Sequence, residues 1–123
     1  MLPEQDVSSF IRATFRSVWA LELLCFLRQN RDRRLLHDEM VAGLRGSDLV
    51  VTQSVGSLTA AGLVLADPDG SARYQPASDE LDRLVEAAAA LYVKSPDAVR
   101  RTIVAAANPA ATAFADAFRF RKD

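Results

Sequence analysis

Cys25 and His37 are the only cysteine and the only histidine in the sequence, and these two side-chain types carry much of the nucleophilic, redox and metal chemistry of proteins. His37 has no second histidine or cysteine at ligand spacing, which disfavours a metal site. Cys25 stands in the apolar run 23–27, where a thiol is usually an inert core side chain and not a redox switch. Because no pair of nucleophile and base stands out, we expect no enzymatic activity, no metal and no cofactor.

Four carboxylates lie close together in a segment with helical periodicity: Asp79, Glu80, Asp82 and Glu86. Acidic side chains are favoured in the first turn of a helix because they interact with the positive end of its dipole. We interpret this group as a solvated helix start. Gly43 and Gly46 lack the following lysine and the preceding strand of a phosphate-binding loop. Neither feature therefore predicts catalysis.

Length and composition limit the chain to one domain. Half of its 123 residues are apolar, which is enough to fill one sizeable core. Fifteen basic and sixteen acidic residues leave a net charge of −1, so no overall positive field attracts nucleic acid. The longest apolar run, residues 87–93, is far shorter than the roughly 20 residues that span a bilayer, and the N-terminus has no signal-peptide pattern. We expect a cytoplasmic protein that does not enter a membrane.

The spacing of apolar residues predicts three helices in the first third of the chain. Residues 7–16 form an amphipathic helix, and the dense apolar segment 19–27 forms a central helix that is covered on several sides. A short third helix follows the polar stretch 28–34 and ends near Gly46.

A fourth helix is expected over 48–61 and a β-hairpin directly after it. Ser47 and Asp48 can cap the start of this helix, and Gly62 suits the left-handed conformation that ends one. Its buried side consists of Val51, Val55 and Leu58. Two short extended runs, 63–66 and 71–75, flank the turn sequence 67–70 and predict the hairpin.

Helical periodicity returns after Pro76 and continues to the break at residues 95–96. Ser95 and Asn108 each stand directly before a proline, which predicts two closing helices. The last helix carries three aromatic and three basic residues: Phe114, Phe118, Arg119, Phe120, Arg121 and Lys122. They either pack the helix onto the domain, with the cations at its negative end, or form a basic end that contacts DNA phosphates or an acidic partner.

The order of these elements resembles a known family. Two helices joined by a tight turn precede the hairpin, and the junction reads Leu58-Thr59-Ala60-Ala61-Gly62-Leu63-Val64. Over residues 17–76 this pattern resembles the winged helix-turn-helix of bacterial transcription regulators of the MarR and PadR types. The resemblance implies a mainly α fold with a small β-hairpin, the wing, and extra N- and C-terminal helices (residues 1–16 and 77–123). It also implies that these terminal helices form a homodimer.

The same resemblance implies a double-stranded DNA partner, with helix 48–61 in the major groove. With the apolar side of that helix turned inward, the outward positions are Val50, Thr52, Gln53, Gly56 and Ser57. Gln53 can make a paired contact to adenine, and Thr52 and Ser57 can contact a base or a phosphate. Further phosphate contacts are expected from Arg45 and Arg73, and from the cluster Arg31, Arg33 and Arg34.

A protein partner is the alternative. Residues 31–75 contain five basic and six acidic residues, so the module expected to face DNA is not basic overall. Asp67 and Asp69 occupy the hairpin turn, where they would repel phosphates. The sequence is therefore also compatible with a winged-helix module that binds another protein through the same helix and hairpin, without direct DNA binding.

Overall fold

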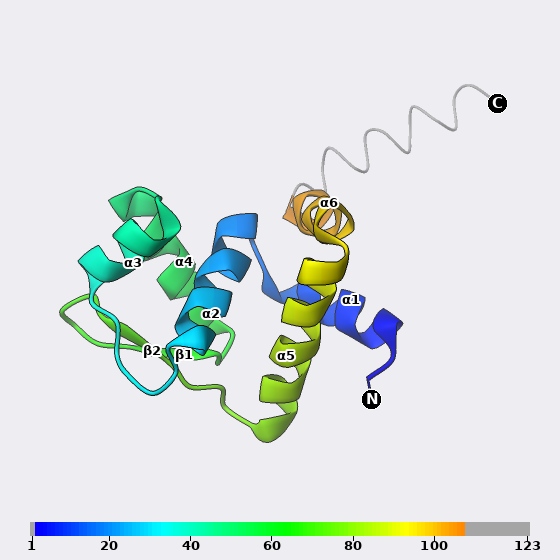
Figure 1. The fold of residues 1–123 in the computed structure, drawn as a ribbon, viewed down its shortest axis with the longest axis horizontal. Coiled ribbons are helices and arrows are strands. Elements are labelled where there is room, and N and C mark those ends of the chain that lie inside the picture. The colour runs from blue at the N-terminus through cyan, green and yellow to red at the C-terminus, as the bar shows by residue number, and fades with distance from the viewer. Residues whose placement is uncertain (1, 108–123) are drawn as a thin grey trace.

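The computed structural model describes residues 2–107, which are mainly helical with one small antiparallel sheet (Figure 1). The elements are α1 (Glu4–Thr14), α2 (Val18–Gln29), α3 (His37–Leu44), α4 (Asp48–Ala60), β1 (Val64–Ala66), β2 (Ala72–Tyr74), α5 (Asp79–Lys94) and α6 (Pro96–Ala107). The predicted fold class, mainly α with a hairpin, is confirmed at this level. The predicted last helix, with Phe114, Phe118 and the basic ending, lies outside the described residues.

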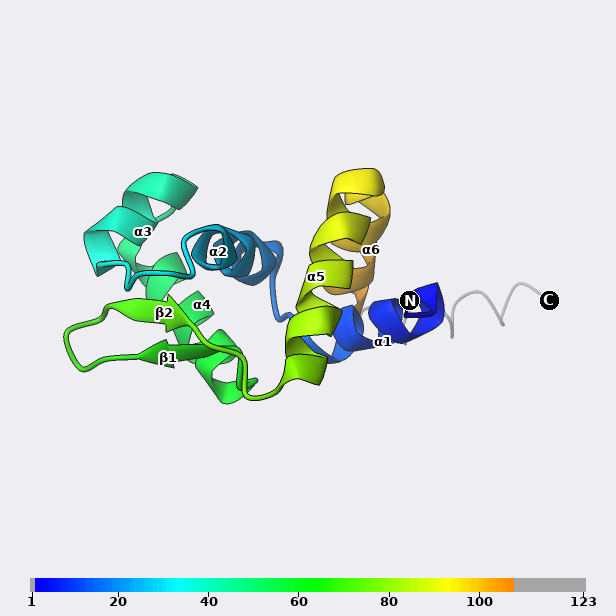
Figure 2. The ribbon, with the colours of Figure 1, turned by 60° about the horizontal axis from the view of Figure 1, so that its bottom comes forward.

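Helix α2 lies between two groups of elements (Figures 1 and 2). On one side α1, α5 and α6 pack against one another. On the other side α3, α4 and the hairpin surround α2. Ser17 caps the start of α2 by accepting a hydrogen bond from the Ala20 amide at 3.2 Å. Four leucines of the helix are almost fully buried, as its apolar density predicts: Leu21, Leu23, Leu24 and Leu27.

Helix α1 ends two residues earlier than its apolar pattern predicts. It stops at Thr14, and Phe15 is extended, with φ −97° and ψ 121°. Phe15 is buried and packs edge-on against Phe10, with the ring centroids 5.9 Å apart. Arg16 therefore belongs to the connection between α1 and α2, where it is exposed.

The turn between α3 and α4 depends on two local conformations. Arg45 adopts the left-handed region, with φ 56° and ψ 34°, and ends α3. Ser47 then caps α4, since its hydroxyl oxygen accepts from the Val50 amide at 3.1 Å. Gly62 follows α4 with φ +78°, which confirms the predicted glycine-dependent end of this segment.

The segment after Gly62 is a hairpin, as predicted. Residues opposite one another in its register are Val64 and Tyr74, Leu65 and Arg73, and Ala66 and Ala72. In the turn, Asp69 accepts hydrogen bonds from the amide and the hydroxyl of Ser71, at 2.9 and 2.6 Å. Leu35 adds a short bridge to the other edge of β2, with reciprocal backbone hydrogen bonds to Ala72 of 2.8 and 2.9 Å. The loop before α3 is thereby fixed to the hairpin.

The carboxylates of α5 differ from the expected solvated helix start. Asp79 and Glu80 are exposed, but Asp82 accepts a hydrogen bond from the Tyr74 hydroxyl at 2.6 Å. Asp82 and Glu86 also lie 3.8 and 3.6 Å from the Arg28 guanidinium of α2. Periodicity placed these carboxylates on a helix but did not show that α2 and β2 pack beside it.

Candidate functional site

Helix α4 presents a polar face opposite its buried face. Val51, Val55 and Leu58 are buried, as predicted, together with Ser54. Thr52, Gln53 and Gly56 are exposed, whereas Ser57 and Val50 are half-buried. The sequence reasoning missed Leu49, which is 64% exposed one helical turn before Gln53. Leu49 is two residues before the buried Val51, which places it almost on the opposite side of the helix, so the helical period could have predicted its exposure.

Thr52 lies on the side of α4 that faces the hairpin. A hollow of about 340 Å³ separates the two elements there. Its lining includes Thr52, Gly56 and Thr59 of α4, and Asp67, Pro68 and Gly70 of the turn. Asp67 is the acidic residue of this lining, and its carboxylate lies 2.9 Å from the Arg34 guanidinium.

Gln53 and Ser57 lie on the opposite side of α4, toward the connection between α1 and α2. Two adjoining hollows, of about 330 and 420 Å³, occur on this side, and both are lined by Arg16 and Ser57. The lining of the first also includes Gln53 and the exposed Trp19. Arg16 was not among the predicted site residues, because its approach to α4 depends on how α1 ends and α2 begins.

Arg45 and Arg73 are exposed cations on either side of α4 in the chain. Arg45 occupies the turn directly before α4, and Arg73 lies on the face of β2 that points away from the core, opposite Leu65. Within residues 2–107 neither guanidinium lies within 4.0 Å of a carboxylate. Both are therefore available to an anionic ligand.

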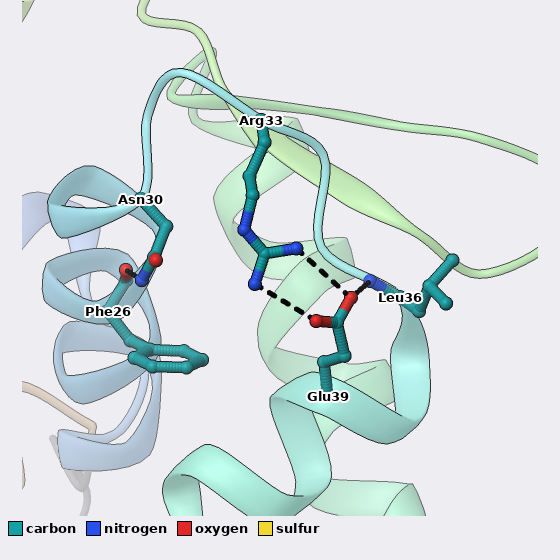
Figure 3. Close-up of polar contacts among 5 residues, drawn as sticks. All are labelled: Phe26, Asn30, Arg33, Leu36 and Glu39. Carbon is teal, nitrogen blue, oxygen red and sulfur yellow. Dashed lines mark hydrogen bonds and ion pairs between the residues drawn. The ribbon is translucent and has the colours of Figure 1, made fainter.

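Arg33 and Arg34 are already paired with carboxylates. Figure 3 shows Arg33 in a two-point contact with Glu39, at 3.0 and 3.4 Å, while Glu39 Oε1 also accepts from the Leu36 amide at 2.9 Å. These contacts lower the pKa of Glu39, first through the Arg33 hydrogen bonds and then through the Leu36 amide. Arg34 lies 2.9 Å from Asp67 of the hairpin turn. The predicted basic cluster is thus partly neutralised within the chain.

The surroundings of His37 and Cys25 favour roles in the structure of the domain over roles in chemistry. His37 Nε2 lies 3.0 Å from Asp48 Oδ1, a contact that joins the starts of α3 and α4 and leaves the His37 side chain 27% exposed. Burial raises the pKa of Cys25 to about 11, helped by the nearby Glu22 carboxylate, so its thiol is neutral at neutral pH. Among the residues that the structure describes, no three His, Cys, Asp or Glu side chains are arranged to hold a metal ion.

Comparisons with protein-family models, with curated proteins and with solved structures found no match. The helices between residues 2 and 107 include none with the length and apolar character needed to cross a membrane. The functional interpretation therefore depends on the geometry of α4, the hairpin and the arginines around them.

Proposed function

We propose that the protein is a DNA-binding transcription regulator that acts as a homodimer, with helix 48–61 in the major groove at each half of a roughly palindromic site. One observation carries the proposal. The exposed polar face of α4 stands on a buried face that packs against α2 and α3, and a hairpin follows directly after Gly62. This arrangement is the one expected of a winged helix-turn-helix of the MarR or PadR type, in which α4 reads DNA and the hairpin is the wing.

The polar side chains of α4 and the nearby arginines then have separate roles in the proposal. Gln53 contacts adenine, while Thr52 and Ser57 contact bases or phosphates from the two sides of α4. Arg45 and Arg73, which have no carboxylate partner among the described residues, contact phosphates. Arg33 and Arg34 contribute less because each has to exchange a carboxylate for a phosphate.

The terminal helices are the proposed dimer interface. α1, α5 and α6 gather on the side of α2 away from α3 and the hairpin, so contacts between subunits there leave α4 free (Figure 2). Val93 of α5 is 85% exposed and offers an apolar side chain to a second subunit. A mass measured in solution tests the dimer. In a bacterial cell such a regulator works in the cytoplasm, where the chromosome lies.

Titration of labelled genomic DNA fragments tests the function. We expect saturable binding that weakens steeply with salt, because each cation on a phosphate adds about 0.9 to the slope of log K against log salt. Gln53→Ala is expected to relax discrimination between fragments, whereas Arg73→Ala weakens binding to all of them. Absence of binding at low salt would contradict the proposal.

A protein-binding function is the second candidate, and one observation favours it. Leu49 on α4 and Leu65 on β1 are 64% and 53% exposed, and the hairpin turn is acidic. Exposed apolar side chains within a weakly charged surface are typical of protein interfaces. A partner that co-purifies after nuclease treatment, and is lost in Leu49→Ser but retained in Val93→Ser, supports this candidate over DNA binding.

A further inference from the structure

We propose that Arg16 and Ser57, with Gln53, form a binding site for a DNA backbone phosphate beside α4. The ligand class is a phosphodiester of the strand that passes this side of the helix. This inference rests on the proposed DNA-binding function and adds to it a contact that the sequence alone did not suggest.

The composition of the two hollows beside Arg16 is the first argument. Arg16 and Ser57 line both hollows, Thr14 lines one and Gln53 the other, and no Asp or Glu of residues 2–107 lines either. Within residues 2–107 Arg16 makes no ion pair, in contrast to Arg33 and Arg34. A cation among hydrogen-bond donors, without an internal counter-charge, is suited to bind an anion.

The position of the hollows is the second argument. Gln53 belongs to the exposed face of α4 and also lines the hollow, so a ligand held there adjoins the surface expected to meet the bases. When a helix enters the major groove, the phosphates of the flanking strands pass along its sides. On the hairpin side of α4 no arginine or lysine of the described residues lines the corresponding hollow, and Asp67 there is already paired with Arg34, so that side offers a phosphate no free cation. The Arg16 side is therefore the favourable one.

Trp19 makes this site measurable. It is the only tryptophan in the sequence, the residue is 42% exposed, and it lines the same hollow as Arg16 and Ser57. A phosphodiester that enters the hollow changes the surroundings of the indole ring. Trp19 fluorescence therefore reports occupation of the site directly.

The test compares Arg16→Ala with Arg101→Ala in the full chain. Both remove one exposed arginine, but Arg101 lies on α6, which contributes no residue to either hollow. In duplex titrations we expect Arg16→Ala to weaken binding to a preferred and to an unrelated sequence alike, by about eightfold per bound subunit near 0.1 M salt. The salt slope falls by about one per bound subunit, and the Trp19 response to DNA decreases. Because α6 belongs to the proposed dimer interface, the solution mass of Arg101→Ala is measured first; with the mass of the unaltered protein, Arg101→Ala leaves all three readings unchanged.

The outcomes separate this inference from the proposed function. If the unaltered protein binds no duplex, the proposed DNA-binding function and the Arg16 phosphate site are both wrong. If it binds, and Arg16→Ala behaves as Arg101→Ala does, only the phosphate site fails. A Trp19 response that micromolar inorganic phosphate saturates also overturns it, because that result identifies a small-anion site.

A conservative pair guards against a folding artefact. Arg16→Lys keeps the positive charge, and Arg16→Gln replaces it with a shorter, neutral polar side chain. Recovery of the salt slope by lysine but not by glutamine supports the site. Equal slopes in the two variants would overturn it.

Discussion

The Tyr74 hydroxyl of β2 donates a 2.6 Å hydrogen bond to Asp82 Oδ1 of α5. Tyr74 is otherwise buried, and Asp82 also faces the Arg28 guanidinium of α2. Burial raises the pKa of Tyr74, and the Asp82 carboxylate raises it further. At the other end of α5 the Tyr92 hydroxyl donates to Glu22 of α2. Two polar contacts thus join the terminal helices to α2 and the hairpin.

Tyr74→Phe is expected to lower the free energy of unfolding by about 1.5 kcal/mol or more, because it removes one hydrogen bond to a charged acceptor and keeps the buried ring. Urea unfolding followed by circular dichroism measures the change. Glu80→Gln, which alters an exposed carboxylate of the same helix start, is the control and is expected to change stability far less. Equal stability of Tyr74→Phe and the unaltered protein would show that the contact contributes nothing.

Cys25 is expected to resist alkylation while the protein is folded. With a pKa of about 11, about one thiol in a thousand is ionised at pH 8, so iodoacetamide reacts slowly, and the rate rises about tenfold per pH unit. Because the folded pKa lies above that of an unfolded cysteine, this group's stabilising contribution is intact below about pH 8.5 and is lost as the pH rises toward 11. Mass spectrometry against time, with a urea-unfolded control, measures the rate. Equal rates in folded and unfolded protein would contradict the expectation.

Gly43 and Gly56 are expected to respond oppositely to alanine. A Cβ on Gly43 would lie 2.5 Å from Phe26 Cζ, whereas one on Gly56 has no such neighbour within 4 Å. Gly56→Ala therefore raises stability by roughly 0.5–1 kcal/mol through helix propensity, and Gly43→Ala lowers it by about 1 kcal/mol or more because Phe26 has to move. Thermal unfolding of the two variants compares them. If both variants are stabilised, the Phe26 ring can move without an energetic penalty and the prediction for Gly43→Ala is wrong.

Glu39→Gln is expected to strengthen DNA binding. The substitution removes the charge that holds Arg33, while the glutamine carbonyl can still accept from the Leu36 amide, so the start of α3 is retained. The freed guanidinium adds a phosphate contact and steepens the salt slope by up to about one per subunit. Fluorescence anisotropy with a labelled duplex at several salt concentrations measures it. Glu80→Gln on α5, with the same charge change, should leave the slope unaltered.

Local patterns in the sequence were sufficient to predict most of the fold. The period of Val51, Val55 and Leu58, the cap at Ser47 and the glycine after α4 are encoded within a few residues of one another, and each prediction is confirmed. The end of α1 was placed two residues too late. The buried Phe15 continues the apolar period of the helix although its backbone is extended. Periodicity alone therefore cannot distinguish a last helical residue from an extended residue that is buried directly after the helix.

The candidate site was less predictable because it depends on contacts between distant segments. The exposed polar face of α4 followed from the helical period. By contrast, Arg34 meets a carboxylate 33 residues away in the chain, and Arg16 reaches α4 across the connection after α1. The spacing of residues within one helix or strand does not predict such contacts between distant segments. The same reason explains why Asp82, on a predicted solvated face, is the partner of Tyr74.

The length of β1 has a consequence for solubility at high concentration. Among the described residues, β1 pairs only with β2, so its outer edge faces no other strand. An open edge of this kind can recruit extended segments from neighbouring molecules and start aggregation. Here the edge spans three residues and then enters a turn that carries Asp67, Pro68 and Asp69. The hairpin can therefore project from the body of the molecule without offering a surface on which fibrils grow.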